Sequence, residues 1–200
     1  MNNTTRAKIL QRCFEAIAEK GFETLRTDKE IARLKITKGA FYHYFPNKLE
    51  LCYAVIDEII LPMYLERWSN LEGRTQGVAT AVLAIIEKEK TQASDKSIAK
   101  GDVLANLMIE MSHADAQFRE KLENVLEAQV KILQKALLAG KAAGEIKSNM
   151  DARSMAYSMI GSLHGCYAIA KTRASKDVFT LMMSNLQRQL SDSVFEPVMA

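Results

Sequence analysis

The sequence predicts an all-α protein, in which an N-terminal three-helix module is joined by a long fourth helix to a larger C-terminal helical bundle. Only 3 Pro and 9 Gly occur among 200 residues, so long helices are possible and a turn-rich β fold is disfavoured. Apolar residues recur at three- and four-residue steps, and no useful stretch alternates apolar with polar residues. Two capping-box spacings fall within the first 50 positions, which indicates a compact module of short helices.

The first two helices are expected over residues 5–20 and from Thr27 to Leu34. Apolar side chains recur with helical spacing in the first segment, and Gly21 then supplies a left-handed C-cap. Thr27, followed three residues later by Glu30, has the spacing of a capping box. We therefore expect Thr27 to cap the second helix.

The third and fourth helices are expected on either side of Pro46. Thr37 can cap a short helix over residues 38–44, which the proline must stop. Asn47 then opens an apolar fourth helix over residues 47–61, which Pro62 kinks or ends. Later helices are expected over residues 78–90, 103–112, 115–139, 151–172 and 177–191, with breaks near Gly73 and closure by Gly140 and Gly144.

Positive charge is concentrated at the N-terminal end. Residues 1–50 carry 10 Lys/Arg and 6 Asp/Glu, whereas residues 51–200 carry 17 and 18. A local basic excess is typical of a nucleic-acid-binding surface, although a merely solvated surface shows it too. We expect residues 1–48 to form a DNA-binding domain, residues 47–61 to lead onward, and residues 62–200 to bind a ligand and dimerise.

The segment from Thr27 to Lys48 has the spacing of a helix-turn-helix. Phe41 and Phe45, four residues apart, would face inward, and the second helix would present its N-terminal residues to base edges. Gly39 would let the backbone approach the duplex closely. A plain helix-packing cluster of aromatic residues is the alternative for this segment taken alone.

The run from Thr37 to Leu51, TKGAFYHYFPNKLEL, closely resembles the recognition-helix signature of the tetracycline-repressor (TetR) family. The resemblance implies a cytoplasmic, homodimeric, all-α regulator, usually a repressor released by a small molecule. One departure is a turn that is one residue shorter, with Lys35 where the family usually has glycine. The candidates for contact with DNA are Thr27, Thr37, Lys38, Gly39, Ala40, Tyr42, His43 and Lys48.

The C-terminal half offers weaker signals. Eight of the ten methionines follow residue 100, and methionine adapts to irregular apolar space, so a pliable cavity for a small, largely apolar effector is one interpretation and plain core packing the other. The candidates for its lining are Trp68, Met108, Met111, His164 and Tyr167. Gly161 and Gly165 permit close helix approach, which favours a dimer interface, although internal packing would look the same.

Enzymatic chemistry has little support. The three histidines lie far apart, no phosphate-binding loop or nucleophile elbow is present, and we expect no cofactor and no metal. The three cysteines form no CxxC pair and are expected to be buried thiols. Without a signal peptide or a long apolar run, the chain is expected to be cytoplasmic and not to engage a membrane.

The leading hypothesis is a DNA-binding regulator, most often a repressor, that a small molecule releases from its operator. Three alternatives remain open: a helical protein-interaction module, a small helical enzyme with a basic lobe, and a redox-sensing regulator that uses Cys166. Binding to DNA that weakens steeply with salt would separate the leading hypothesis from the first two.

Overall fold

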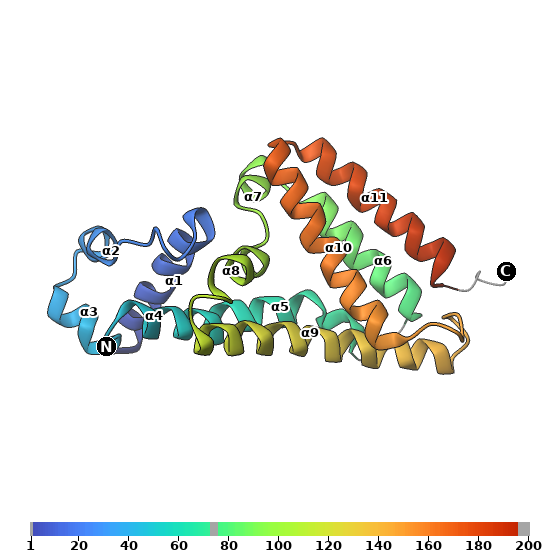
Figure 1. The fold of residues 1–200 in the computed structure, drawn as a ribbon, viewed down its shortest axis with the longest axis horizontal. Coiled ribbons are helices and arrows are strands. Elements are labelled where there is room, and N and C mark those ends of the chain that lie inside the picture. Colours follow the sequence, from blue (N-terminus) through green and yellow to red (C-terminus); the bar gives the residue numbers. More distant parts are fainter. Residues whose placement is uncertain (1, 73–75, 196–200) are drawn as a thin grey trace. The chain divides into compact units, whose positions relative to one another are not determined.

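The computed structural model describes residues 2–72 and 76–195, and in this part of the chain every regular element is helical (Figure 1). The all-α prediction is confirmed, with one isolated bridge between Ile146 and Phe195. The helices are α1 (Asn2–Lys20), α2 (Thr27–Leu34), α3 (Lys38–Tyr44), α4 (Lys48–Val55), a π-helical segment (Ile56–Ile60), α5 (Leu61–Arg67), a 3-10 turn (Ser69–Leu71), α6 (Val78–Gln92), α7 (Asp95–Lys100), α8 (Val103–Met111), α9 (Ala116–Ala142), α10 (Ala152–Arg173) and α11 (Lys176–Ser193).

The chain forms two compact units. The first comprises residues 1–63 and 103–125, and the second comprises residues 64–102 and 126–200. Residues 103–125 therefore group with the N-terminal helices, although the sequence placed them in the C-terminal part. The assignment of DNA binding and ligand binding to separate parts stays a proposal.

In the first unit, α1 packs against α2 and α4, and these helices bury one apolar face each (Figure 1). Gly21 ends α1 with a φ of 82°, as predicted for a left-handed C-cap. The ring of Phe118, at the start of α9, lies edge-on to Phe22 at 5.1 Å and to Tyr53 of α4 at 5.7 Å. Through this aromatic cluster, the start of α9 packs against the N-terminal helices.

One local prediction in this unit is wrong, and one of two alternatives for another is excluded. Thr27 is not a cap: Arg26 occupies that position, without a side-chain bond, and Glu30 is buried because it pairs with arginines. Of the two outcomes expected at Pro62, a kink or a helix end, the end is excluded because the helix continues to Arg67. In the π-helical segment the N–H of Leu61 donates to the carbonyl of Ile56, five residues earlier. This wider turn precedes the proline, which lacks an N–H and would clash within a regular α-helix.

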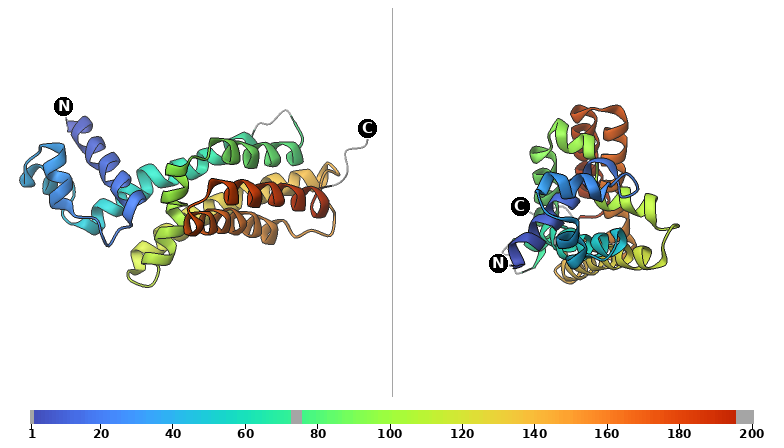
Figure 2. Two further views of the ribbon diagram at one scale, coloured as in Figure 1. Left: turned by 90° about the horizontal axis from the view of Figure 1, so that it is seen from above. Right: turned by 90° about the vertical axis from the view of Figure 1, so that its left-hand side faces the viewer.

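The second unit is a helical bundle around one apolar core, in which α11 packs against both α10 and α6 (Figure 2). Its core includes Trp68, Val82, Ile86, Leu133, Leu137, Ile160, Phe179 and Met183. Gly140 does not close α9, because the helix runs two residues further. A Cβ at Gly140 would lie 2.9 Å from Ile146 Cδ1, so the glycine allows close packing instead.

One helix and some element boundaries were not predicted from the sequence. Helix α7 was not predicted, although Ser94 and Ser97 form a capping box at its start. The predicted break at Gly73 lies outside the described residues. In the described ranges, no helix has the length and apolar character needed to span a membrane.

Candidate nucleic-acid interface

Helices α2 and α3 are joined by a tight turn centred on Lys35. This residue adopts a φ of 54° and a ψ of 41°, the left-handed conformation, and its N–H donates to the carbonyl of Ala32 at 3.2 Å. Thr37 then caps α3, accepting a bond from the N–H of Ala40 at 3.1 Å, as predicted. The turn is therefore that of a helix-turn-helix, made with lysine at a position that favours glycine.

The buried face of α3 determines which of its side chains are exposed to solvent. Phe41 and Phe45 are fully buried with Ile31 of α2, as their four-residue spacing predicts. The guanidinium of Arg6 in α1 lies over the Phe45 ring, 5.2 Å from its centroid. Because these aromatic side chains hold one side of a seven-residue helix, the opposite side is presented to solvent.

The outer face of α3 carries most of the predicted contact residues. Lys38 is 71% exposed and Tyr42 is 43% exposed, and His43 and Thr37 are also exposed. Gly39 has open space around it, since the nearest atom to an added Cβ would be Thr37 Oγ1 at 4.0 Å. Ala40 is half-buried, as is Thr27 at the start of α2. Lys38 lies 3.2 Å from Asp28, an exposed pair that solvent screens.

Lys48 is engaged within the protein rather than extended into solvent. Its ammonium donates to the carbonyl of Glu23 at 3.0 Å and lies 4.3 Å from the centroid of the Phe22 ring. Partial burial lowers the pKa of Lys48 below its ordinary value, and the charge of Glu110 opposes that effect. At the first turn of α4, which Asn47 caps, Lys48 therefore supports the turn between α1 and α2.

Sequence reasoning missed a polar hollow on α1 and α2. Its centre is Glu30, whose carboxylate pairs with Arg12 at 2.6 Å and Arg33 at 2.8 Å. The hollow is lined by Arg12, Ala16, Glu19, Lys20, Thr24, Leu25, Arg26, Lys29, Glu30 and Arg33. The run of basic residues between positions 26 and 33 was the available signal, but Glu30 was interpreted as part of a cap.

Comparisons with known proteins match both parts of the chain. Residues 9–55 match the family model described as bacterial regulatory proteins, tetR family, and residues 79–186 match the tetracyclin repressor-like C-terminal domain. The chain belongs to the TetR family. It is a DNA-binding transcriptional regulator.

Several relatives of this TetR-family regulator share most of its length. An uncharacterised HTH-type transcriptional regulator of Lactococcus lactis is 25% identical over 189 residues, which covers 92% of this chain and 94% of the relative. The fatty acid metabolism regulator protein of Bacillus subtilis is 24% identical over 157 residues, 78% of each chain. The crystal structure of the reduced form of E. coli NemR shares the fold with a TM-score of 0.86 at 19% identity, covering 98% of this chain and 100% of that one.

The C-terminal unit of this TetR-family regulator contains a partly buried ionic cluster. The guanidinium of Arg67 lies between Glu89 at 3.1 Å and Asp102 at 3.4 Å. The Tyr64 hydroxyl donates to Asp102 at 2.6 Å, and the Tyr167 hydroxyl donates to Glu89 at 2.7 Å. Burial raises the pKa of Tyr167, so its hydroxyl stays protonated.

The predicted lining residues are divided between the two units. His164 lies beside the cluster just described, with its Nε2 at 3.6 Å from Asp102, and Tyr167 is a member of it. Trp68 is a core residue, whose indole N–H donates to the buried Gln129 at 3.1 Å. Met108 and Met111 belong to the first unit on α8. Three of the five candidates, Trp68, His164 and Tyr167, therefore lie in the second unit, and the other two lie in the first.

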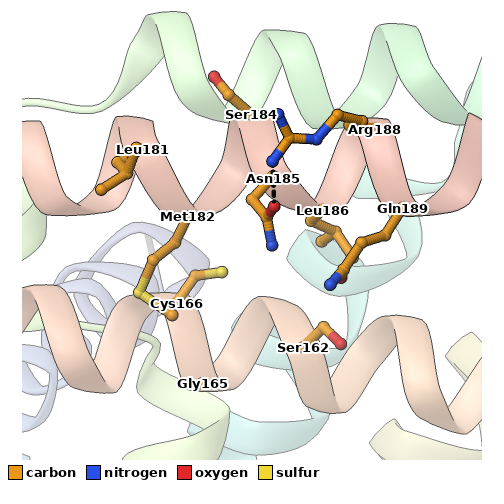
Figure 3. Close-up of a pocket in the computed structure, with 10 residues that line it drawn as sticks. All are labelled: Ser162, Gly165, Cys166, Leu181, Met182, Ser184, Asn185, Leu186, Arg188 and Gln189. Carbon is orange, nitrogen blue, oxygen red and sulfur yellow. Dashed lines mark hydrogen bonds between the residues drawn. The ribbon is translucent and has the colours of Figure 1, made fainter.

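A groove of about 610 Å³ runs between α10 and α11 on the surface of the C-terminal unit (Figure 3). It is lined by Ser162, Gly165, Cys166, Leu181, Met182, Ser184, Asn185, Leu186, Arg188 and Gln189. Gly165, which sequence spacing associated with close helix approach, forms part of its floor on α10, and Leu181 of α11 is 70% exposed. Large exposed apolar side chains at a groove are typical of an interaction surface.

Proposed function

We propose that this TetR-family regulator is a homodimeric repressor, which binds a roughly palindromic operator and is released by a small, largely apolar molecule. The observation that carries DNA recognition is the outer face of α3, where Lys38, Gly39 and Tyr42 stand exposed opposite a buried aromatic face. This is the geometry with which a recognition helix reads the major groove.

Within that proposal, Lys38 reaches a base edge or a phosphate, and the Tyr42 hydroxyl donates to a phosphate. Thr27, Thr37, Ala40 and His43 flank them. Lys48 is also proposed to face the DNA backbone, at the amide end of α4. It would have to exchange its bond to Glu23 for one to a phosphate.

The homodimer is proposed from the groove between α10 and α11, which a second copy would cover.

The effector is proposed to bind in the C-terminal unit near His164 and Tyr167. A similar protein of Mycobacterium, 21% identical over 179 residues, is named the HTH-type transcriptional repressor DhaR. This name supports repression rather than activation. A bacterial regulator of this kind acts on the chromosome, so we propose a cytoplasmic location without membrane contact.

Redox sensing by Cys166 is less well supported. The thiol is buried, and burial raises its pKa, so it remains protonated and poorly nucleophilic. The proposal that the protein is not an enzyme rests on the character of its family.

The test begins with selection of duplexes from a random pool by the wild-type protein. A palindromic consensus, with half-sites about one helical turn apart or slightly more, is expected. Lys38→Gln should then weaken binding to that operator by about 5- to 100-fold. Lys131→Gln on the exposed surface of α9 makes the same charge change and should have little effect. Equal affinities of the two variants would reject α3 as the recognition helix.

A further inference from the structure

The turn between α1 and α2 is bound by a carboxylate from a distant part of the chain. Glu110 of α8 accepts hydrogen bonds from the backbone N–H of Phe22 at 2.9 Å and from that of Glu23 at 2.8 Å. All three residues belong to the first compact unit. The two bonds join positions 88 and 87 residues apart.

The backbone of this turn is shaped to receive an anion. Gly21 has a φ of 82°, and the two N–H groups that follow it converge on the carboxylate. A Cβ at Gly21 would lie 2.7 Å from one oxygen of Glu110, so a side chain there would displace the carboxylate. Hydrogen bonds from backbone N–H to a carboxylate are charge-assisted and stronger than neutral ones.

Lys48 binds a backbone carbonyl of the same turn. Its ammonium binds the carbonyl of Glu23, and the Phe22 ring lies beneath it. Phe22 is buried against Phe118. The turn therefore has its N–H groups bound by Glu110, its carbonyl bound by Lys48 and its side chain buried.

This turn sets where the DNA-binding helices begin. Only residues 24–26 separate it from α2, and α2 leads directly into α3. Leu25 within that short connection is buried. A change in the path of residues 21–23 would therefore shift the start of the helix-turn-helix.

We propose that Glu110 is a positioning residue for operator recognition. It orients the helix-turn-helix through the amides of Phe22 and Glu23. An anionic side chain repels DNA phosphates, so a favourable contribution of Glu110 to DNA binding must come from the geometry of the turn. The proposal rests on the proposed function in one respect, the placement of DNA recognition on α3, and does not depend on the dimer or the effector.

The test compares Glu110→Gln with Glu120→Gln, which removes the same charge from an exposed position on α9 of the same unit. The single carbonyl oxygen of glutamine cannot form both charge-assisted bonds. We expect Glu110→Gln to weaken binding to the selected operator by about tenfold relative to Glu120→Gln, as for loss of a hydrogen bond to a charged group. Binding to random duplex and the salt dependence should match in the two variants, because no phosphate contact is lost.

Hydrogen exchange of the Phe22 and Glu23 amides, followed by NMR, should accelerate in Glu110→Gln. Unchanged operator affinity would overturn the proposal whatever the amides do. An equal loss of affinity for operator and random duplex would also overturn it, since positioning acts on recognition.

A second variant tests whether the effect passes through the contact between Glu110 and the turn. Gly21→Ala introduces the Cβ that displaces the carboxylate, and it should weaken operator binding in the wild-type background. If both variants act through one contact, Glu110→Gln should weaken binding less in the Gly21→Ala background than alone. Fully additive effects would overturn the proposal.

Discussion

Lys35 carries strain at the centre of the helix-turn-helix. Its left-handed conformation brings the Cβ of an L-residue close to the following carbonyl, whereas glycine has no Cβ. The side chain is exposed and can be removed without opening a cavity.

We expect Lys35→Gly to raise the free energy of unfolding by about 0.5–1 kcal/mol, the relief of strain exceeding the extra entropy of the unfolded chain. Urea denaturation would measure the change. Ala174→Gly, at a φ of 47° after α10, should act in the same direction. Lys131→Gly, within α9, should lower stability by about 1 kcal/mol. A loss of stability in Lys35→Gly would show that the lysine side chain itself stabilises the turn.

His164 illustrates how burial controls a titrating group. Burial lowers its pKa below 6.5 and so does Arg67, while Asp102 opposes them. Among the described residues its Nε2 has no hydrogen-bond partner. As the pH falls through the ordinary histidine range, the unfolded chain binds a proton that the folded protein does not bind. The contribution of this group therefore makes the protein less stable in acid.

Stability measured by denaturant at about pH 7.5 and about pH 5.5 tests this direction. Wild type should lose more stability on acidification than His164→Gln, because glutamine does not titrate. The carboxylates titrate in both proteins, so their effect cancels in the comparison. An identical loss in the two proteins would contradict a depressed pKa.

At the scale of helices, α10 and α11 present the most exposed apolar surface of the second unit. The short connection at residues 174–175 makes them an antiparallel hairpin, and the groove between them contains Leu181. Covering an exposed leucine with another surface is favourable, because apolar area is then removed from water.

If a second copy covers this groove, Leu181→Glu should weaken the dimer by at least about tenfold, since a buried unpaired carboxylate opposes association. Sedimentation equilibrium at micromolar concentration would measure it. The fold should persist because Leu181 is already 70% exposed. Leu138→Glu on α9, 51% exposed and outside the groove, is the matched control. A dimer equally stable in both variants would place the interface elsewhere.

For the whole molecule, the proposed function requires the effector and the operator to be linked. Asp102, held in the partly buried ionic cluster, immediately precedes α8, the helix that carries Glu110. A molecule that changes the partners of Asp102 would therefore act at the start of that helix.

A molecule identified by thermal-shift screening should bind more weakly when the selected operator is present. Binding linkage requires the same factor in both directions, typically about 5- to 150-fold. Calorimetric titrations with and without the operator would measure it, with random duplex as the control. Equal affinity for the molecule in the presence and absence of operator would reject ligand-controlled release.

The local sequence was sufficient for most of the elements, including the bounds and the buried face of α3. Thr37 and Asn47 cap helices within three residues of themselves, and the spacing of Phe41 and Phe45 alone determines which side of α3 is buried. Pro62 alone left open whether the helix would kink or end, because the π-helical turn that accommodates it lies in the preceding residues.

Only the tertiary structure decided which partner each charged side chain takes. Glu30 was interpreted as a cap, but Arg12 of α1 binds it. Lys48 was expected to contact DNA, but in this structure it is bound by the Glu23 carbonyl and lies over the Phe22 ring. Glu110 gave no signal at all, since the amides it binds lie almost ninety residues earlier. Helical periodicity is a property of neighbouring residues, so the sequence displays it directly. The partner of a buried charge depends on which distant segments the fold brings together, and no local pattern contains that information.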